Sequence, residues 1–236
     1  MTQHQSGYSM QIGGIQKLST IDYPGYTVAS VFTIGCNMRC GYCHNPGLVL
    51  PERYVGAIPT DDVLAWLETR RGLLEGVAIS GGEPTMHSDL PDFIRACRRM
   101  GFRIKLDTNG TNPTMLCQLL DEGLVDFIAM DIKGPLERYV QIAARPIDLG
   151  AICESIRLIQ TIDHEFRTTI VRGQLTLQDF EAIGRLVQGA QRFALQQFVD
   201  GQTVSPQFAG STSFTTVEMN EARRTLERFV ERCVVH

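Results

Sequence analysis

The chain has 236 residues, 43% of them hydrophobic, which suffices for one large α/β domain. Its 26 acidic and 22 basic residues are spread along the chain and give a net charge of -4, so the sequence offers no basic surface for nucleic acid or anionic lipid. The first residues, MTQHQSGYSMQIGG, lack the apolar core of a signal peptide, and no segment approaches an apolar run of about 18 residues, so we expect a cytoplasmic protein without a membrane span.

Six short runs of apolar or β-branched residues recur along the chain, and each is followed by a segment with helical periodicity. This alternation is typical of βα units around a parallel sheet. The predicted strands are residues 27–34, 76–80, 102–107, 124–132, 165–171 and 193–199. Helices are predicted from 90 to 100 behind a Ser88 cap, after Asn112-Pro113, and as a closing helix over 216–233. Periodicity alone fits either an open sheet or a partial barrel.

Polar motifs follow the first four predicted strands. The cysteine cluster at 36–43 follows the first strand, GGEP at 81–84 follows the second, DTNG at 107–110 ends the third, and DIKG at 131–134 ends the fourth. In parallel α/β proteins, ligands bind at the carboxyl ends of the strands. We therefore predict an active site on this rim.

The chain has seven cysteines, which are not expected to form a disulfide framework in a reducing compartment, and the odd number leaves one unpaired in any case. Clustered cysteines in such a compartment favour metal or redox chemistry. Four of them are isolated within apolar helical patterns, where a free cysteine behaves as a small hydrophobe. These expected core residues are Cys97, Cys117, Cys153 and Cys233.

The other three cysteines have the spacing Cys36-x3-Cys40-x2-Cys43. A zinc site would need His44 as its fourth ligand, and no second ligand pair exists in the sequence. A haem attached at Cys40-Gly-Tyr-Cys43-His44 would require export from the cytoplasm. Three thiolates in one loop can instead hold three irons of a four-iron cluster and leave the fourth iron open, and this interpretation is favoured.

The spacing C-x3-C-x2-C, with the aromatic Tyr42 before the last cysteine, resembles the signature of the radical S-adenosylmethionine enzymes. Together with HNP, GGEP, DTNG and D-x-K, it resembles the activases of glycyl radical enzymes. The runs IGGIQKLSTIDYPG, KLDTNGTNP and AMDIKGP resemble the branch that activates anaerobic ribonucleoside-triphosphate reductases. The similarity covers about residues 10 to 200.

The resemblance implies a set of site residues. The three cysteines would hold one 4Fe-4S cluster, since residues 44–80 contain no further cysteine. The segment Ser80-Gly81-Gly82-Glu83 would meet the amino group of S-adenosylmethionine. The remaining residues are Asp107, Thr108 and Asp131, a candidate site for Na⁺ or K⁺, with Lys133 near the cofactor and Tyr42 and His44 at its adenine end.

Each motif also has an ordinary structural interpretation. GGEP alone is a common turn between strand and helix, and DTNG alone is a helix-capping turn. Arg167, Thr168, Val171 and Gln197 are candidates to face the cofactor, but alternation places only every second strand residue on a given face. The region of Gln197, LQQFVDGQ, lacks the histidine that part of the family uses there.

The resemblance implies a partial (β/α)6 barrel, in a single domain over 1–236 with a core of about 24–200 and a C-terminal extension over 201–236. It implies reductive cleavage of S-adenosylmethionine to a 5′-deoxyadenosyl radical, which takes hydrogen from a glycine Cα of a partner. We expect that partner to be an anaerobic ribonucleotide reductase, with a flavodoxin- or ferredoxin-type electron donor. Two alternatives remain: a radical enzyme acting on a small molecule, as in deazapurine biosynthesis, for which Arg167 and Arg172 are among few polar candidates, and a non-catalytic metal-binding module.

Overall fold

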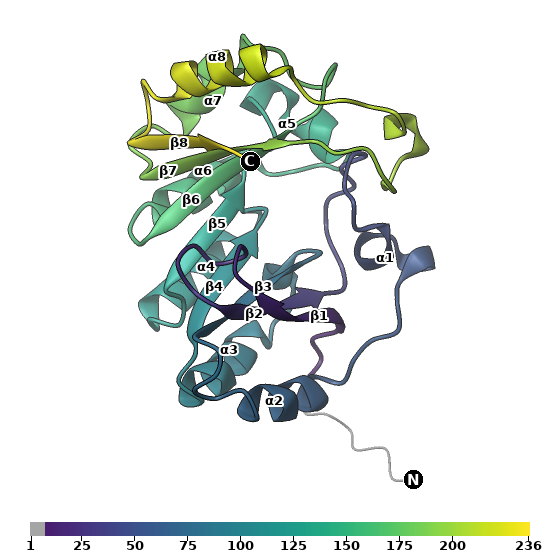
Figure 1. Cartoon of the computed structure of the whole chain (residues 1–236), viewed down its shortest axis with the longest axis vertical. Helices are drawn as coiled ribbons and strands as arrows, with labels where there is room; N and C mark the ends of the chain where they lie inside the picture. The colour runs from purple at the N-terminus through teal and green to yellow at the C-terminus, as the bar shows by residue number, and fades with distance from the viewer. Residues whose placement is uncertain (1–7) are drawn as a thin grey trace.

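The computed structural model describes residues 8–236, and its frame is one eight-stranded sheet (Figure 1). The strands lie in the order in which they occur in the chain, with β1 antiparallel to β2 and every later pair parallel. Their bounds are β1 Ile12–Ser19, β2 Val28–Thr33, β3 Gly76–Gly81, β4 Arg103–Thr108, β5 Phe127–Asp131, β6 His164–Ile170, β7 Arg192–Gln197 and β8 Arg232–Val235. The six predicted strands correspond to β2 through β7, so the predicted α/β class is confirmed.

The two edge strands differ from the sequence prediction. Strand β1 was not expected, and it adds an antiparallel edge to β2. The predicted closing helix is also too long, because α8 spans only Thr216–Leu226 and the chain then turns into β8. Cys233 therefore lies on a strand, paired with Phe193 of β7, rather than on a helix. The β-branched residues Val234 and Val235 favour the extended conformation at this end.

Helices cover the outer face of the sheet (Figure 1). Their bounds are α1 Pro46–Val49, α2 Thr60–Glu68, α3 Leu90–Arg99, α4 Pro113–Asp121, α5 Leu136–Ala143, α6 Leu149–Ile159, α7 Asp179–Leu186 and α8 Thr216–Leu226. Asn112 caps α4 as expected, since its side chain accepts a hydrogen bond from Met115 N. The Ser88 cap is wrong: Asp89 occupies the N-cap position of α3, and its carboxylate binds Ser9 N and Met10 N instead.

The apolar core lies mainly between the sheet and these helices, and it includes the completely buried rings of Phe93, Phe166 and Phe193. A second, smaller cluster of buried residues consists of Tyr23, Val28, Ala78, Phe127 and Ala129. Val28 and Phe127 are the first residues of their strands, so this cluster fills the amino-terminal end of the sheet. Apolar side chains therefore close this end of the sheet.

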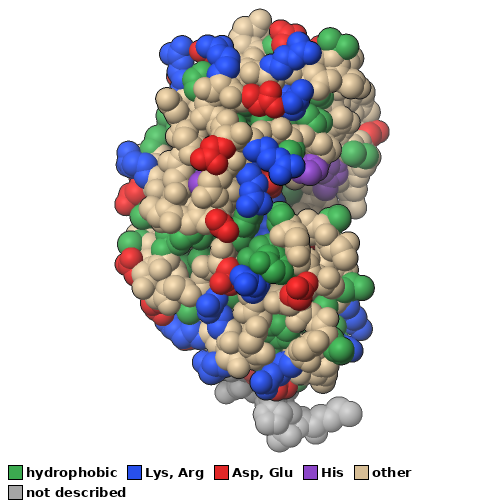
Figure 2. All heavy atoms as spheres, turned by 60° about the vertical axis from the view of Figure 1, so that its left-hand side comes forward, with side chains coloured by type: hydrophobic (Ala, Val, Ile, Leu, Met, Phe, Trp, Pro, Cys, Tyr) green, Lys and Arg blue, Asp and Glu red, His purple; other side chains and the backbone are tan. Residues whose placement is uncertain are grey.

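The face shown in Figure 2 carries acidic and basic side chains interspersed with one another, in keeping with the small net charge. No helix within residues 8–236 is long and apolar enough to cross a membrane. Of the four isolated cysteines, Cys97 and Cys233 are buried as expected, whereas Cys117 and Cys153 are only half-buried. The core assignment is therefore wrong for Cys117 and Cys153.

Helix α8 begins with a capping box whose glutamate, Glu218, has a lowered pKa. Thr215 Oγ1 accepts a hydrogen bond from Glu218 N, the Glu218 carboxylate accepts one from Thr215 N, and Arg172 forms an ion pair with the same carboxylate. The hydrogen bonds from Arg172 and Thr215 lower the pKa of Glu218 to about 2. We expect an NMR pH titration to place the Glu218 midpoint near that value rather than near the ordinary glutamate pKa of about 4.3.

The sign of the linked stability follows from that lowered pKa. The contribution of Glu218 to stability is complete above the unfolded-state pKa and is lost as the pH falls through the folded-state pKa of about 2. In Arg172→Gln the Glu218 midpoint should move back toward the ordinary value. A wild-type midpoint at the ordinary value would contradict the ion pair.

Candidate functional site

A cavity of about 280 Å³ opens at the carboxyl ends of the parallel strands. All four polar motifs reach it, so the predicted convergence on one rim is confirmed. The predicted residues that line it are Cys36, Cys40, Tyr42, Cys43, His44, Ser80, Gly81, Gly82, Glu83, Asp107, Thr108, Asp131, Lys133 and Arg167.

The cysteine loop connects β2 to α1 and is fixed from two directions. Its backbone is tied to itself by a hydrogen bond from Cys43 N to Cys40 O, 3.0 Å long. The segment after β7 crosses over it, where Val204 N and Ser205 N donate to Cys43 O and Gly41 O at 2.9 Å each. We call residues 204–208 the strap. The strap packs tightly, because a Cβ added to Gly41 would lie 2.4 Å from the ring of Phe208 in the strap.

The three thiols are suited to a metal cluster. All three are free, Cys40 is buried, and Cys36 and Cys43 are half-buried. Burial raises the pKa of Cys36 to about 12 and also raises those of Cys40 and Cys43, so the thiolates need a nearby positive charge such as that of a metal.

A mononuclear zinc site does not fit this loop. Among residues 8–236, no three His, Cys, Asp or Glu side chains are arranged as ligands of one metal ion. The fourth ligand considered for zinc, His44, has its Nε2 2.8 Å from Val199 O and its ring stacked on Phe198. Thiols that each bind a different metal atom of a cluster do not need to converge on one point.

The Gly81-Gly82 segment forms a cradle beside the cysteine loop. Gly81 has φ +113°, in the region that side chains disfavour, and a Cβ on Gly82 would lie 1.9 Å from Gly35 O. Gly82 N donates to Thr33 O at 2.9 Å and Glu83 N to Gly35 O at 2.7 Å. The backbone there comes closer to its neighbours than any residue other than glycine allows.

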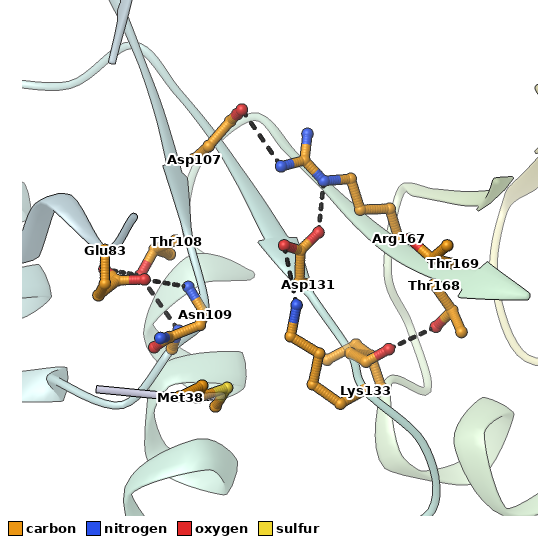
Figure 3. A network of polar contacts seen from close by, with 12 residues as sticks. Met38, Glu83, Asp107, Thr108, Asn109, Asp131, Lys133, Arg167, Thr168 and Thr169 are labelled. Atoms are coloured by element: carbon orange, nitrogen blue, oxygen red, sulfur yellow. Dashed lines mark hydrogen bonds and ion pairs between the residues drawn. The ribbon is translucent and has the colours of Figure 1, made fainter. Parts of the chain in front are cut away.

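Glu83 follows this cradle and has a role that the sequence did not reveal. Glu83 is 1% exposed, and its carboxylate accepts hydrogen bonds from Thr85 N and Thr85 Oγ1. The same carboxylate accepts two more, from Thr108 Oγ1 and Asn109 N (Figure 3). Thr108 ends β4, so this carboxylate ties the end of β3 to the end of β4. Both of its oxygens are engaged within the protein, in addition to any contact with a ligand.

A chain of charged side chains crosses the cavity from β4 to β6 (Figure 3). Arg167 lies between Asp107, with Nη2 3.2 Å from Oδ2, and Asp131, with Nε 2.6 Å from Oδ1. Lys105 Nζ is 2.5 Å from Asp107 Oδ1, and Lys133 Nζ is 3.1 Å from Asp131 Oδ2. Burial alone would raise the pKa of Asp131, but the Arg167 and Lys133 cations hold it well below its usual value.

The candidates on the last two predicted strands lie on different faces of the sheet, and only some of them reach the cavity. Arg167 lines the cavity, whereas Thr168 points away and donates to Ile132 O at 2.7 Å. Val171 is buried in the apolar core, and Gln197 is exposed and lies outside this cavity. Of these four candidates, Arg167 lines this cavity, and Thr168, Val171 and Gln197 do not.

Several cavity residues were not predicted from the sequence, and three of them bear on the site. Thr169 and Gln196 line it, as does Asn109, whose Nδ2 is 3.9 Å from Cys36 Sγ. Alternation from Arg167 indicates Thr169, since residues two apart share a face. Gln196 is adjacent in the sequence to Gln197, the residue named as the candidate on this strand.

Comparisons with known proteins agree with this geometry. The family model of the radical SAM superfamily matches residues 30–187. A candidate glycyl-radical enzyme activating enzyme of Methanocaldococcus jannaschii is 29% identical over 231 residues, covering 95% of each chain. The pyruvate formate-lyase 1-activating enzyme of Escherichia coli is 30% identical over 132 residues, covering 52% of each chain. The 7-carboxy-7-deazaguanine synthase of Methanopyrus kandleri is 33% identical over 132 residues, covering 48% of this chain and 52% of that protein.

The fold is also similar to a solved structure. SuiB of Streptococcus suis superposes with a TM-score of 0.65 at 12% identity, over 88% of this chain and 47% of that one. The chain thus spans about half the length of SuiB and of the two shorter matches above. The expected barrel-type α/β fold is confirmed, with β1 and β8 added to the six predicted strands.

Proposed function

The chain belongs to the radical SAM superfamily, and on that basis we propose that it activates a glycyl radical enzyme. The observation that carries this proposal is the match to the Methanocaldococcus jannaschii protein, which extends over 95% of both chains. Enzymes of this activating class act on a protein, so the substrate we propose is a glycine in a partner chain.

The donor set of the cavity fits the two groups that such an enzyme needs. Cys36, Cys40 and Cys43 would hold a 4Fe-4S cluster, because they are free thiols in one loop that do not converge on a single ion. Gly81 and Gly82 line the same cavity, so a ligand there can reach the segment that they form. When bound, the cluster and S-adenosylmethionine supply one-electron reductive cleavage of the sulfonium and, through it, hydrogen abstraction.

The protein's own residues position these groups and exclude water. The Ser80-Gly81-Gly82 backbone would bind the amino group of S-adenosylmethionine, and Lys133 and Arg167 offer positive charge to its carboxylate. Tyr42 is buried at the cavity wall, and burial raises its pKa well above the usual value, so it stays a neutral phenol. His44, stacked on Phe198, would contact the adenine end.

We propose an anaerobic ribonucleotide reductase as the partner, because the runs IGGIQKLSTIDYPG, KLDTNGTNP and AMDIKGP resemble the branch that activates these reductases. A flavodoxin- or ferredoxin-type donor would supply the electron. A cytoplasmic location belongs to the same proposal, because free thiols persist in a reducing compartment.

A second candidate function is suggested by the match to the deazaguanine synthase, which acts on a small molecule. That match covers about half of each chain. Of the two arginines considered as small-molecule ligands, Arg172 lies outside the cavity and pairs with Glu218. Arg172 is therefore not available to a small substrate in the cavity, and Arg167 is the one of the two that lines it.

The test is anaerobic reconstitution with iron and sulfide, followed by reduction with S-adenosylmethionine and a candidate anaerobic ribonucleotide reductase. We expect 5′-deoxyadenosine to form and the glycyl radical doublet to appear by electron paramagnetic resonance. The same reductase with its target glycine replaced by alanine is the control. Cleavage of S-adenosylmethionine without a radical on any glycyl radical enzyme would favour the small-molecule alternative.

A further inference from the structure

Every carboxylate oxygen of Asp107 and Asp131 is already bound to a cationic side chain. Asp107 uses Oδ1 for Lys105 and Oδ2 for Arg167, and Asp131 uses Oδ1 for Arg167 and Oδ2 for Lys133. These are the two aspartates expected to hold Na⁺ or K⁺. An alkali ion at this position would have to displace one of the three cations from its oxygen.

The third expected ligand is engaged as well. Thr108 Oγ1 donates its proton to Glu83 Oε1 at 2.8 Å and accepts a hydrogen bond from Gly110 N at 3.1 Å. It lies on the Glu83 side of the cavity, and Figure 3 shows it apart from the ion pairs of Arg167. Its remaining capacity to bind a cation is therefore small.

The charge balance also disfavours an added ion. Two carboxylates face three cations, which gives the cluster a net charge of +1 if all five groups are ionised. The side chains of Lys105, Asp107 and Arg167 are 5%, 14% and 16% exposed, so water screens their charges only weakly. A further positive charge would add to this excess, and no oxygen of Asp107 or Asp131 is free to bind it.

We propose that the Arg167 guanidinium takes the place of an alkali cation in this cavity. It bridges the ends of β4 and β5 through Asp107 and Asp131, and its Nη1 makes no hydrogen bond within residues 8–236, which leaves it for the carboxylate of S-adenosylmethionine (Figure 3). The inference rests on the S-adenosylmethionine part of the proposed function and is independent of the partner's identity.

The first test uses the protein without cluster or S-adenosylmethionine and measures sodium binding by the broadening of the ²³Na NMR signal. The wild-type protein should not broaden the ²³Na signal by specific binding, which would be recognised because added K⁺ reverses it. Arg167→Gln frees one oxygen on each aspartate and should bind Na⁺ in competition with K⁺. Arg167→Lys keeps the positive charge and should not.

The matched control is Arg172→Gln, which also frees a carboxylate, that of Glu218, but outside the cavity. It should behave like the wild type. Sodium binding by the wild type, or its absence in folded Arg167→Gln, would overturn the proposal. Circular dichroism melting establishes that each variant is folded.

The second test measures S-adenosylmethionine affinity on the reconstituted, unreduced protein, with tetramethylammonium as the only other cation. Wild-type affinity should be the same after Na⁺ or K⁺ is added. Arg167→Gln should bind about tenfold more weakly or worse, as expected for the loss of a charge-assisted hydrogen bond, and should recover part of that affinity in saturating K⁺.

A wild-type affinity that depends on alkali ions would overturn the proposal. If no form of the protein binds S-adenosylmethionine, the proposed function fails, whereas the ²³Na measurement still decides whether Arg167 excludes the ion.

Discussion

Replacing Cys40 by serine is expected to remove the iron–sulfur cluster and to reduce S-adenosylmethionine cleavage to background. A serine hydroxyl is a much weaker iron ligand than a thiolate because it does not ionise near neutral pH, and Cys40 is the most buried of the three cysteines, so water has the least access to its position. Iron and acid-labile sulfide per chain, followed by chromatographic detection of 5′-deoxyadenosine, measure the two losses.

The controls for Cys40→Ser are Cys117→Ser and Cys153→Ser. Both cysteines are half-buried on helices α4 and α6, away from the cavity, so both variants should keep wild-type iron content. A Cys40→Ser protein that retains the full cluster, or equal losses in all three variants, would contradict the assignment.

Replacing Gly82 by alanine should both destabilise the protein and eliminate S-adenosylmethionine binding. The added methyl group would lie 1.9 Å from Gly35 O, and Gly35 N would be 3.2 Å away, so backbone rather than a flexible side chain has to move. That movement strains the hydrogen bonds from Gly82 N to Thr33 O and from Glu83 N to Gly35 O. We expect a loss of roughly 2–4 kcal/mol in the free energy of unfolding, measured in urea.

Gly56→Ala is the matched control for Gly82→Ala. A Cβ at Gly56 meets nothing within 4 Å and the residue does not have a positive φ, so its stability should change by less than about 0.5 kcal/mol. Isothermal titration with S-adenosylmethionine on both reconstituted variants separates loss of binding from loss of fold. Wild-type stability in Gly82→Ala would show that the cradle is more pliable than its contacts indicate.

The sequence predicted the parts of the fold that carry a strong repeating pattern. Strands β2 to β7 were found because each is an apolar run followed by a helix, and the four motifs met in space because parallel strands end on one side of a sheet. Strand β1 contains two glycines and several polar residues among its apolar ones, and β8 is only four residues long. Neither edge strand has enough apolar pattern to be distinguished from a loop or the end of a helix.

Within the site, the errors come from strand parity and from contacts between distant residues. Gln196 and Gln197 are adjacent in β7 and only the first of them lines the cavity, so an error of one residue in the predicted alternation exchanges them. The role of Glu83 depends on Thr108 and Asn109 from the next βα unit, and the role of Arg167 depends on aspartates from two other strands. No local pattern reports such contacts before the sheet is assembled.

The strap over the cysteine loop has a consequence for the order in which the protein folds. Each strand pairs with its neighbour in sequence, so the sheet can grow from β1 to β8 as the chain is synthesised. The contacts of Val204 and Ser205 with Cys43 and Gly41 join segments near opposite ends of the chain, and they form only after β7 is complete. The loop that carries the three thiols is translated early, and it becomes fully constrained only when nearly the whole chain has emerged.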